Sequence, residues 1–78
     1  MGSQLPKHGT RYADEVARLE ASLRLRLRGY VCDFRISIQE GSLVLYGRAW
    51  TYYGKQLAQH GVMQQSRLPI RANHIEVF

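Results

Sequence analysis

The sequence has a single cysteine, Cys32, two prolines and no long apolar run. One cysteine excludes an intramolecular disulfide and a cysteine-based metal cluster. The longest uninterrupted apolar run, Leu43 to Tyr46, is far too short to cross a bilayer. Met1 to Pro6 contains no apolar stretch of the kind that a signal peptide requires. These absences predict a chain that is cytoplasmic if it is complete, and otherwise a piece of a longer protein.

Residues that carry catalysis or bind metals are also few, and they form no motif. The three histidines, His8, His60 and His74, lack the spacing of metal ligands. No glycine-rich phosphate loop precedes a helix pattern, and no nucleophile has a base nearby in a motif. We therefore expect no enzymatic activity, no metal and no cofactor.

Acidic residues are outnumbered, because the chain has 11 lysines and arginines against six aspartates and glutamates, for a net charge of +5. A basic chain attracts anionic partners over long range, although charge alone does not choose between a membrane and a nucleic acid. A length of 78 residues corresponds to one small domain with a thin core. We place this domain at residues 10–78, after a disordered tail at residues 1–9.

The remaining pattern is organised around a predicted hairpin at residues 34–47. From Phe34 to Ile38 apolar and polar residues alternate, which is the period of a strand with one buried face. Glu40-Gly41 forms a two-residue turn, whose glycine tolerates the positive φ of a tight hairpin. The strand that returns is apolar on both faces, which favours the middle of a sheet. Cys32 shares the parity of the inward residues, so we expect it to be buried.

A first helix is predicted from residue 12 to 28, with Thr10 as its N-cap and Gly29 just past its end. Apolar residues recur at helical spacing, at Tyr12, Val16, Leu19, Leu23 and Leu27. Residues 23–28 also alternate with period two, which leaves an amphipathic strand as the alternative; Leu25 is the residue that the helix does not explain. The acid-first pairs Asp14–Arg18 and Glu20–Arg24 indicate a solvated, self-paired face.

A second helix is predicted from a Thr51 N-cap to about Gln65. Its apolar stripe contains Gly54 and Gly61, each costing a helix about 1 kcal/mol relative to alanine. We expect close approach of this helix to the sheet as the compensation. Pro69 then breaks the helix, and residues 70–78 form a last strand. The predicted fold is a two-layer α+β domain of order αββαβ, with a three-stranded mixed sheet and two helices on one face.

Three stretches carry a resemblance to a known family. The hairpin has the pattern Ile36-x-Ile38-x-Glu40-Gly41-x-Leu43-x-Leu45-x-Gly47. The second stretch is Tyr52-Tyr53-x-Lys55-Gln56-Leu57-Ala58. The third, near the end of the chain, is Asn73-x-Ile75-x-Val77. These patterns resemble the BON domain, named for bacterial osmotically inducible and nodulation proteins. The resemblance implies the same element order and a non-catalytic bacterial module that binds phospholipid or another envelope component. It also implies association with the envelope if the chain is part of a larger protein.

Two surfaces are candidate binding sites. The first comprises Arg48, Tyr52 and Lys55 around the start of the second helix, as a lipid or anion site. We expect Trp50 and Tyr53 to close the end of the core beside them. The second is the open face of the sheet, with the residues Arg35, Ser37, Val44 and Tyr46.

The leading hypothesis is a non-enzymatic module that associates weakly with an anionic membrane surface or an envelope component, as a monomer or weak dimer. The alternative is a protein–protein interaction or homodimerisation module that uses the open face around Val44 and Tyr46. Nucleic acid is the weaker interpretation, because neither a Gly-x-x-Gly loop between helices nor aromatic residues on adjacent exposed strands are recognisable in the sequence.

Overall fold

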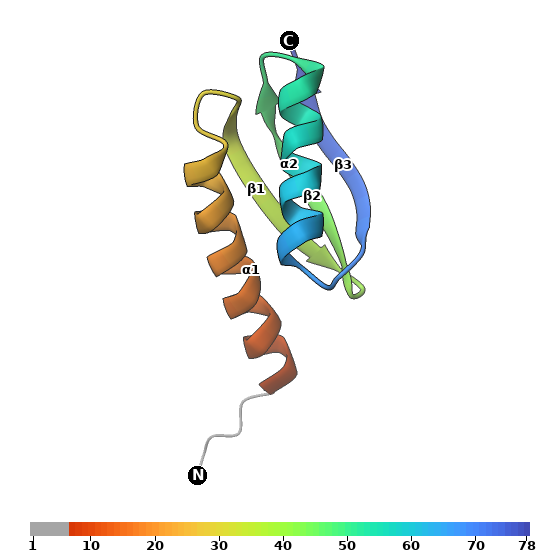
Figure 1. Ribbon diagram of the computed structural model, residues 1–78. Coiled ribbons are helices and arrows are strands. Elements are labelled where there is room, and N and C mark those ends of the chain that lie inside the picture. Colours follow the sequence, from red (N-terminus) through yellow and green to blue (C-terminus); the bar gives the residue numbers. More distant parts are fainter. Residues whose placement is uncertain (1–6) are drawn as a thin grey trace.

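The computed structural model describes residues 7–78, with side chains from residue 13 onward (Figure 1). Its elements are, in order, α1 (Lys7–Arg26), β1 (Val31–Gln39), β2 (Ser42–Ala49), α2 (Tyr52–Gln65) and β3 (Ile70–Val77). The central strand β2 is antiparallel to β1 and parallel to β3. Both helices cover one face of this mixed sheet, so the predicted α+β architecture is confirmed. With α2 in front, β3 lies to the right of β2, which is the right-handed crossover.

The hairpin between β1 and β2 has the predicted two-residue turn. Glu40 has φ 52° and Gly41 has φ 79°, so both central residues adopt the left-handed conformation of a type I′ turn. This turn fixes the register, pairing Gln39 with Ser42 and continuing through the ladder. The hairpin therefore forms at the predicted position.

The start of β1 departs from simple alternation. The pairing register shifts between Cys32 and Arg35, and Asp33 takes φ 54°. This bulge adds a residue to β1, so Val31 and Phe34 are buried while Cys32 is exposed. The prediction that Cys32 is buried is wrong, because the bulge reverses the parity on which it rested.

Helix α1 confirms the helical interpretation of residues 23–26. Its leucines at 19 and 23 are buried, as is Leu27 just after its last residue, and Leu25 is 69% exposed on the opposite face. The helix begins at Lys7, so the N-cap predicted at Thr10 is wrong and residues 7–9 of the expected tail are helical. It ends at Arg26, and Gly29 adopts φ 87° in the turn that follows, where the carbonyl of Leu27 accepts two backbone hydrogen bonds. Residues 1–6 of the expected tail lie outside the described residues.

Charged residues of α1 bond to the free edge of β1. The carboxylate of Glu20 accepts a hydrogen bond of 2.8 Å from the backbone N–H of Ile36. Arg24 Nε donates to the carbonyl of Phe34 at 3.0 Å and pairs with Glu20 at 3.4 Å. Two backbone groups of an edge strand are thereby satisfied by side chains. Among residues 13–78 the other predicted pair, Asp14 with Arg18, is not within ion-pair distance.

Helix α2 begins where predicted, because the hydroxyl of Thr51 accepts from the N–H of Gly54 at 3.1 Å. A Cβ added to Gly54 would lie 2.7 Å from the backbone oxygen of Tyr30, and one added to Gly61 would lie 2.7 Å from Cδ2 of Leu23. Close approach at both glycines is confirmed. The nearest atoms belong to α1 and the loop after it, and the predicted approach to the sheet is present only at Gly54, where the added Cβ would lie 3.4 Å from Cβ of Ala49 in β2.

Strand β3 is tied to α2 by one polar side chain. Asn73 Nδ2 donates to the carbonyl of Lys55 and to Oε1 of Gln59, at 3.3 and 3.2 Å. Its Oδ1 accepts from the backbone N–H of Ile75, which is itself buried in the core. The Asn-x-Ile segment therefore fixes both the helix above the strand and the conformation of the strand.

Candidate functional site

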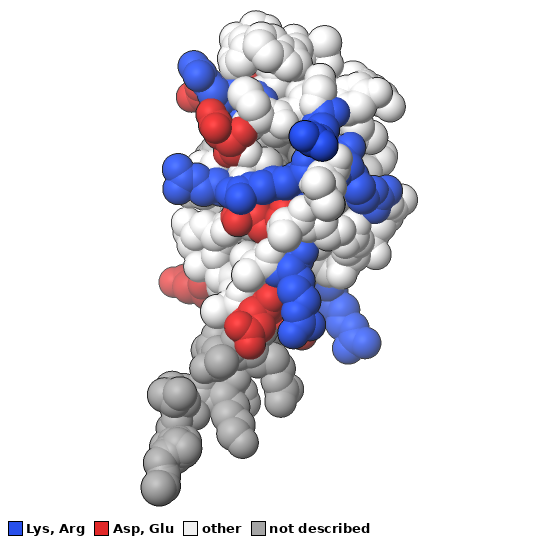
Figure 2. Space-filling model, turned by 90° about the vertical axis from the view of Figure 1, so that its left-hand side faces the viewer, with Lys and Arg blue, Asp and Glu red and all other residues white. Residues whose placement is uncertain are grey.

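Exposed aromatic side chains gather at one end of the molecule, which we call the aromatic end. It comprises Tyr30, Trp50, Tyr52, Tyr53 and Phe78, each between 44% and 64% exposed. They come from the loop after α1, the β2–α2 connection, the first turn of α2 and the residue that follows β3. Figure 1 shows these segments meeting at its upper end. Figure 2 shows basic and acidic side chains interspersed over the α1 and β1 side, with an uncharged upper end.

Two edge-to-face pairs order the aromatic end. The rings of Tyr30 and Tyr53 are 5.8 Å apart, and those of Trp50 and Phe78 are 4.7 Å apart at 87°. The guanidinium of Arg48 lies 5.0 Å from the ring centre of Phe78. The N–H of Phe78 donates to the carbonyl of Ala49 at 3.1 Å, which extends the parallel pairing beyond β3. The rings are therefore held in place while remaining accessible.

The prediction that Trp50 and Tyr53 close the core is wrong. Trp50 is 58% exposed and Tyr53 is 61% exposed. Both lie beyond Ala49 and Val77, the last residue pair of the β2–β3 ladder, so the sheet does not extend under them. The apolar stripe of α2 thus continues past the part of the helix that the core covers.

The three residues of the predicted lipid or anion site do not form one cluster. Arg48 lies on the open face of the sheet, against Phe78. Tyr52 and Lys55 lie on the first turn of α2, on the helix-covered face. Tyr52 is 64% exposed and its hydroxyl accepts from Gln56 at 2.6 Å, whereas Lys55 is half-buried. The basic residues therefore flank the aromatic end from opposite sides of the sheet.

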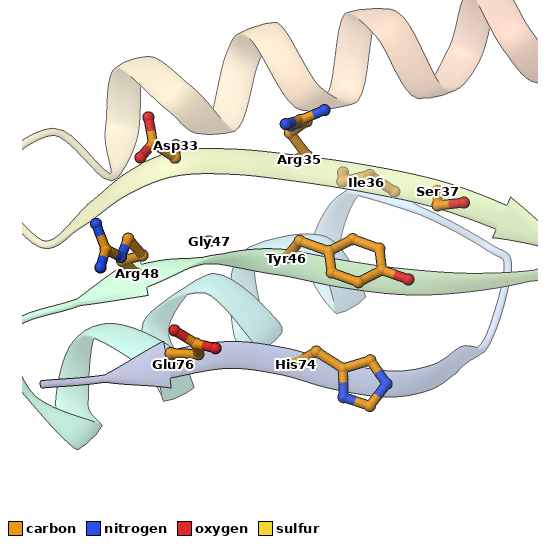
Figure 3. A pocket seen from close by; sticks show the side chains of 9 residues that line it. All are labelled: Asp33, Arg35, Ile36, Ser37, Tyr46, Gly47, Arg48, His74 and Glu76. Carbon is orange, nitrogen blue, oxygen red and sulfur yellow. The ribbon is translucent and has the colours of Figure 1, made fainter.

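A shallow depression of about 580 Å³ crosses the open face (Figure 3). Its lining comes from all three strands, with Asp33, Arg35, Ile36, Ser37, Tyr46, Gly47, Arg48, His74 and Glu76. The rings of Tyr46 and His74 lie side by side on adjacent strands, with centres 5.8 Å apart. Arg35 is opposite Tyr46 in the β1–β2 register. A row of one cation and two rings thus crosses the sheet.

The predicted interaction surface is brought together only in part. Arg35 and Tyr46 are neighbours and exposed, but Val44 is only 2% exposed. Val44 lies on the central strand between Ser37 and Ala72, so strands flank it on both sides. The expectation of an exposed Val44–Tyr46 patch is therefore wrong.

Sequence reasoning missed several residues of both surfaces. Tyr30 and Phe78 join Trp50 and Tyr53 only through the fold, since loops of different elements meet there. His74 joins Tyr46 through the parallel pairing of β2 with β3. Writing the last strand against β2 in register would have revealed this pair.

Within residues 7–78, no helix is long and apolar enough to span a membrane. No group of three or more His, Cys, Asp or Glu residues in this part of the chain is arranged to hold a metal ion. The depression and the aromatic end offer aromatic rings, guanidiniums, carboxylates and hydroxyl groups.

No family model, curated protein or solved structure matches this chain. The resemblance to the BON domain therefore stays a prediction from the sequence.

Proposed function

We propose that this protein is a non-enzymatic binding module that associates with anionic phospholipid surfaces through the aromatic end. The observation that carries the proposal is the exposure of five aromatic side chains at one end of a basic domain. Tryptophan and tyrosine favour the boundary between lipid and water, because each has an apolar ring and a polar group. A small domain rarely leaves so many rings exposed together without a partner.

The charge distribution supports an anionic surface. Arg48 and Lys55 flank the rings, and each basic residue near an anionic membrane contributes about 1 kcal/mol of attraction. The net charge of +5 adds a long-range contribution that salt screens. With two flanking cations, the association is weak and reversible.

The alternative, a protein–protein or homodimerisation module on the open face, has less support. It rested on an exposed apolar patch at Val44 and Tyr46, and Val44 is buried. The exposed remainder of that face is largely charged or polar, with Arg35, Arg48 and Glu76 in the depression. The open face is therefore not the apolar surface that a stable dimer usually buries.

The test mixes the protein with vesicles of neutral phosphatidylcholine, with or without anionic phosphatidylglycerol, and follows the fluorescence of Trp50, the only tryptophan. We expect a blue shift and co-sedimentation with the anionic vesicles alone, and loss of both at high salt. Equal binding to neutral vesicles, or no binding to either, would contradict the proposal. No binding together with concentration-dependent dimerisation would favour the alternative.

A matched pair of variants locates the contact. Tyr53→Ser and Met63→Ser each remove an apolar side chain that is 61% exposed on α2, at its first and last turns respectively. We expect Tyr53→Ser to weaken vesicle binding and Met63→Ser to leave it unchanged. Lys55→Gln should weaken binding about five-fold, which corresponds to the loss of one basic contact. Equal effects at positions 53 and 63 would argue against the aromatic end as the docking surface.

A further inference from the structure

From the open face of the sheet we infer a second binding site, whose ligand is a short segment of single-stranded nucleic acid. Aromatic rings on adjacent exposed strands are the feature that such a site needs and that the sequence alone does not reveal. Tyr46 on β2 and His74 on β3 supply it, with ring centres 5.8 Å apart (Figure 3). Unpaired bases stack on tyrosine and histidine rings largely irrespective of sequence.

The rings alternate with charged residues along the strands. On β2 and just beyond it, Tyr46, Arg48 and Trp50 are spaced by two residues, and all three are exposed. Four residues of strand span about 13 Å, so the ring pair at Tyr46 and the pair of Trp50 with Phe78 are separated by roughly that length. At the ~3.4 Å spacing of stacked nucleotides this distance accommodates about three or four of them. The face is long enough for a short single-stranded segment.

Two arginines are available to contact phosphates. Arg35 lies opposite Tyr46, and Arg48 follows Tyr46 by two residues on β2. Both arginines line the depression. Within residues 13–78 neither is in an ion pair, because the pairs found there join Glu20 with Arg24 and Glu40 with Arg71. Guanidiniums bind phosphate with two parallel hydrogen bonds, and they also stack on bases.

The two carboxylates of the depression favour contact with nucleotide bases over contact with a layer of anionic lipid headgroups. Asp33 and Glu76 would repel a lipid headgroup layer pressed against this face. They suit single strands, whose exposed base edges carry amino donors that aspartate and glutamate accept. Asp33 is held in the depression by a left-handed backbone at φ 54°, which is uncommon for a residue with a side chain. Strained residues of this kind are concentrated at binding sites.

This site meets the proposed lipid contact at Arg48, Trp50 and Phe78, so the tests use residues that belong to only one of the two surfaces. The probe is a fluorescein-labelled 12-nucleotide single strand of mixed sequence, as RNA and as DNA, with a duplex of equal length. Fluorescence anisotropy at low salt should show binding of the single strands in preference to the duplex. Raising the salt should weaken it, with a logarithmic slope of about 0.7 for each phosphate contacted.

Variants on the open face identify the contacts. Tyr46→Thr keeps a strand-forming residue and should weaken single-strand binding roughly 5- to 150-fold, the range for one lost base–ring stack. His74→Asn should weaken it in the same direction, and Arg35→Gln should lower the salt slope by about 0.7. Tyr52→Ser, at the aromatic end, is the matched control that should leave it unchanged. Circular dichroism and melting confirm that each variant is folded.

Several outcomes would overturn the inference. They are the absence of single-strand binding at low salt, equal affinity for duplex, and loss of binding in Tyr52→Ser with Tyr46→Thr unaffected. Self-association without oligonucleotide binding would assign the open face to a second copy instead. The vesicle experiment uses Tyr53 and Lys55, so failure of either proposal leaves the other to be judged separately.

Discussion

The two helices cover the same face of the sheet, one with large side chains and the other with small ones. Helix α1 presents buried leucines, while the buried residues of α2 are Gly54, Ala58, Gly61 and Val62. The two surfaces interlock, since Leu23 of α1 occupies the space that a side chain at Gly61 would fill. Large residues on one helix therefore require small residues on the other.

The comparison shows how differently the two helices are stabilised. The described part of α1 is rich in leucine and arginine, which favour helix formation. Helix α2 has two interior glycines, which together cost about 2 kcal/mol in helix propensity. Its formation depends on the Thr51 cap and on close packing against α1 and the loop after it. We expect α1 to tolerate lost volume poorly, and α2 to tolerate added volume poorly where a backbone atom opposes it.

Loss of volume at the contact between the helices should have the largest effect. Leu23 is fully buried, so Leu23→Ala should destabilise the protein by about 2–5 kcal/mol, measured by urea unfolding. Leu25→Ala, on the exposed face of the same helix, is the control and should change stability by less than about 0.5 kcal/mol. Similar losses at both positions would contradict the buried contact.

Added volume at the first glycine of α2 should have the next largest effect. In Gly54→Ala the new Cβ would meet the backbone oxygen of Tyr30 at 2.7 Å, and a backbone atom cannot rotate away as a side chain does. Overpacking of this kind costs about 1–3 kcal/mol. Nearly all of this range exceeds the gain of about 1 kcal/mol in helix propensity that alanine brings. Thermal melting should therefore show a lower Tm, and an unchanged or raised Tm would show that the loop relaxes.

Loss of the polar contact between α1 and the sheet should have an effect of similar size. Glu20→Ala removes the acceptor for the backbone N–H of Ile36 and the partner of Arg24, at a cost of about 1–2 kcal/mol. The control is Glu15→Ala, which changes an exposed carboxylate on the same helix. Amide hydrogen exchange at Ile36 should accelerate in the first variant only. Unchanged exchange there would mean that water replaces the carboxylate at no measurable cost.

The fold was predictable because its elements are signalled locally. The alternation from Phe34 to Ile38, the Glu40-Gly41 turn and the Thr51 cap each act within a few residues. The bulge at Asp33 was not, because it depends on an aspartate taking a left-handed conformation and on Gly47 in the facing strand. A Cβ at Gly47 would lie 3.1 Å from the carbonyl oxygen of Cys32, so the two strands approach closely there.

The candidate surfaces were less predictable than the fold, since they are assembled from distant segments. The stripe of α2 includes Tyr53, but its spacing does not show where the sheet beneath it ends. The pairing of Tyr46 with His74 joins residues on either side of α2 and follows only from the parallel register. Alternation assigned Val44 to the open face, but its burial depends on the strands at both sides.

Substitution of Gly61, the second glycine of α2, should have the smallest effect on stability. It also tests most directly how the two helices fit together. In Gly61→Ala the new Cβ meets Cδ2 of Leu23, the end of a side chain that can shift, rather than a backbone atom. The strain should nearly cancel the gain of about 1 kcal/mol in helix propensity, leaving stability within about 0.5 kcal/mol of the parent by urea unfolding.

The same substitution should behave differently once Leu23 is shortened. In a Leu23→Ala background the clash is absent, and the new methyl group also fills part of the cavity. Gly61→Ala should then stabilise the protein by about 1 kcal/mol or more, so the double-mutant cycle has a coupling energy of that size. A coupling near zero would mean that Leu23 and Gly61 do not share one space. The same cycle with Gly54→Ala should show no coupling, because the atom opposing Gly54 belongs to the backbone of Tyr30.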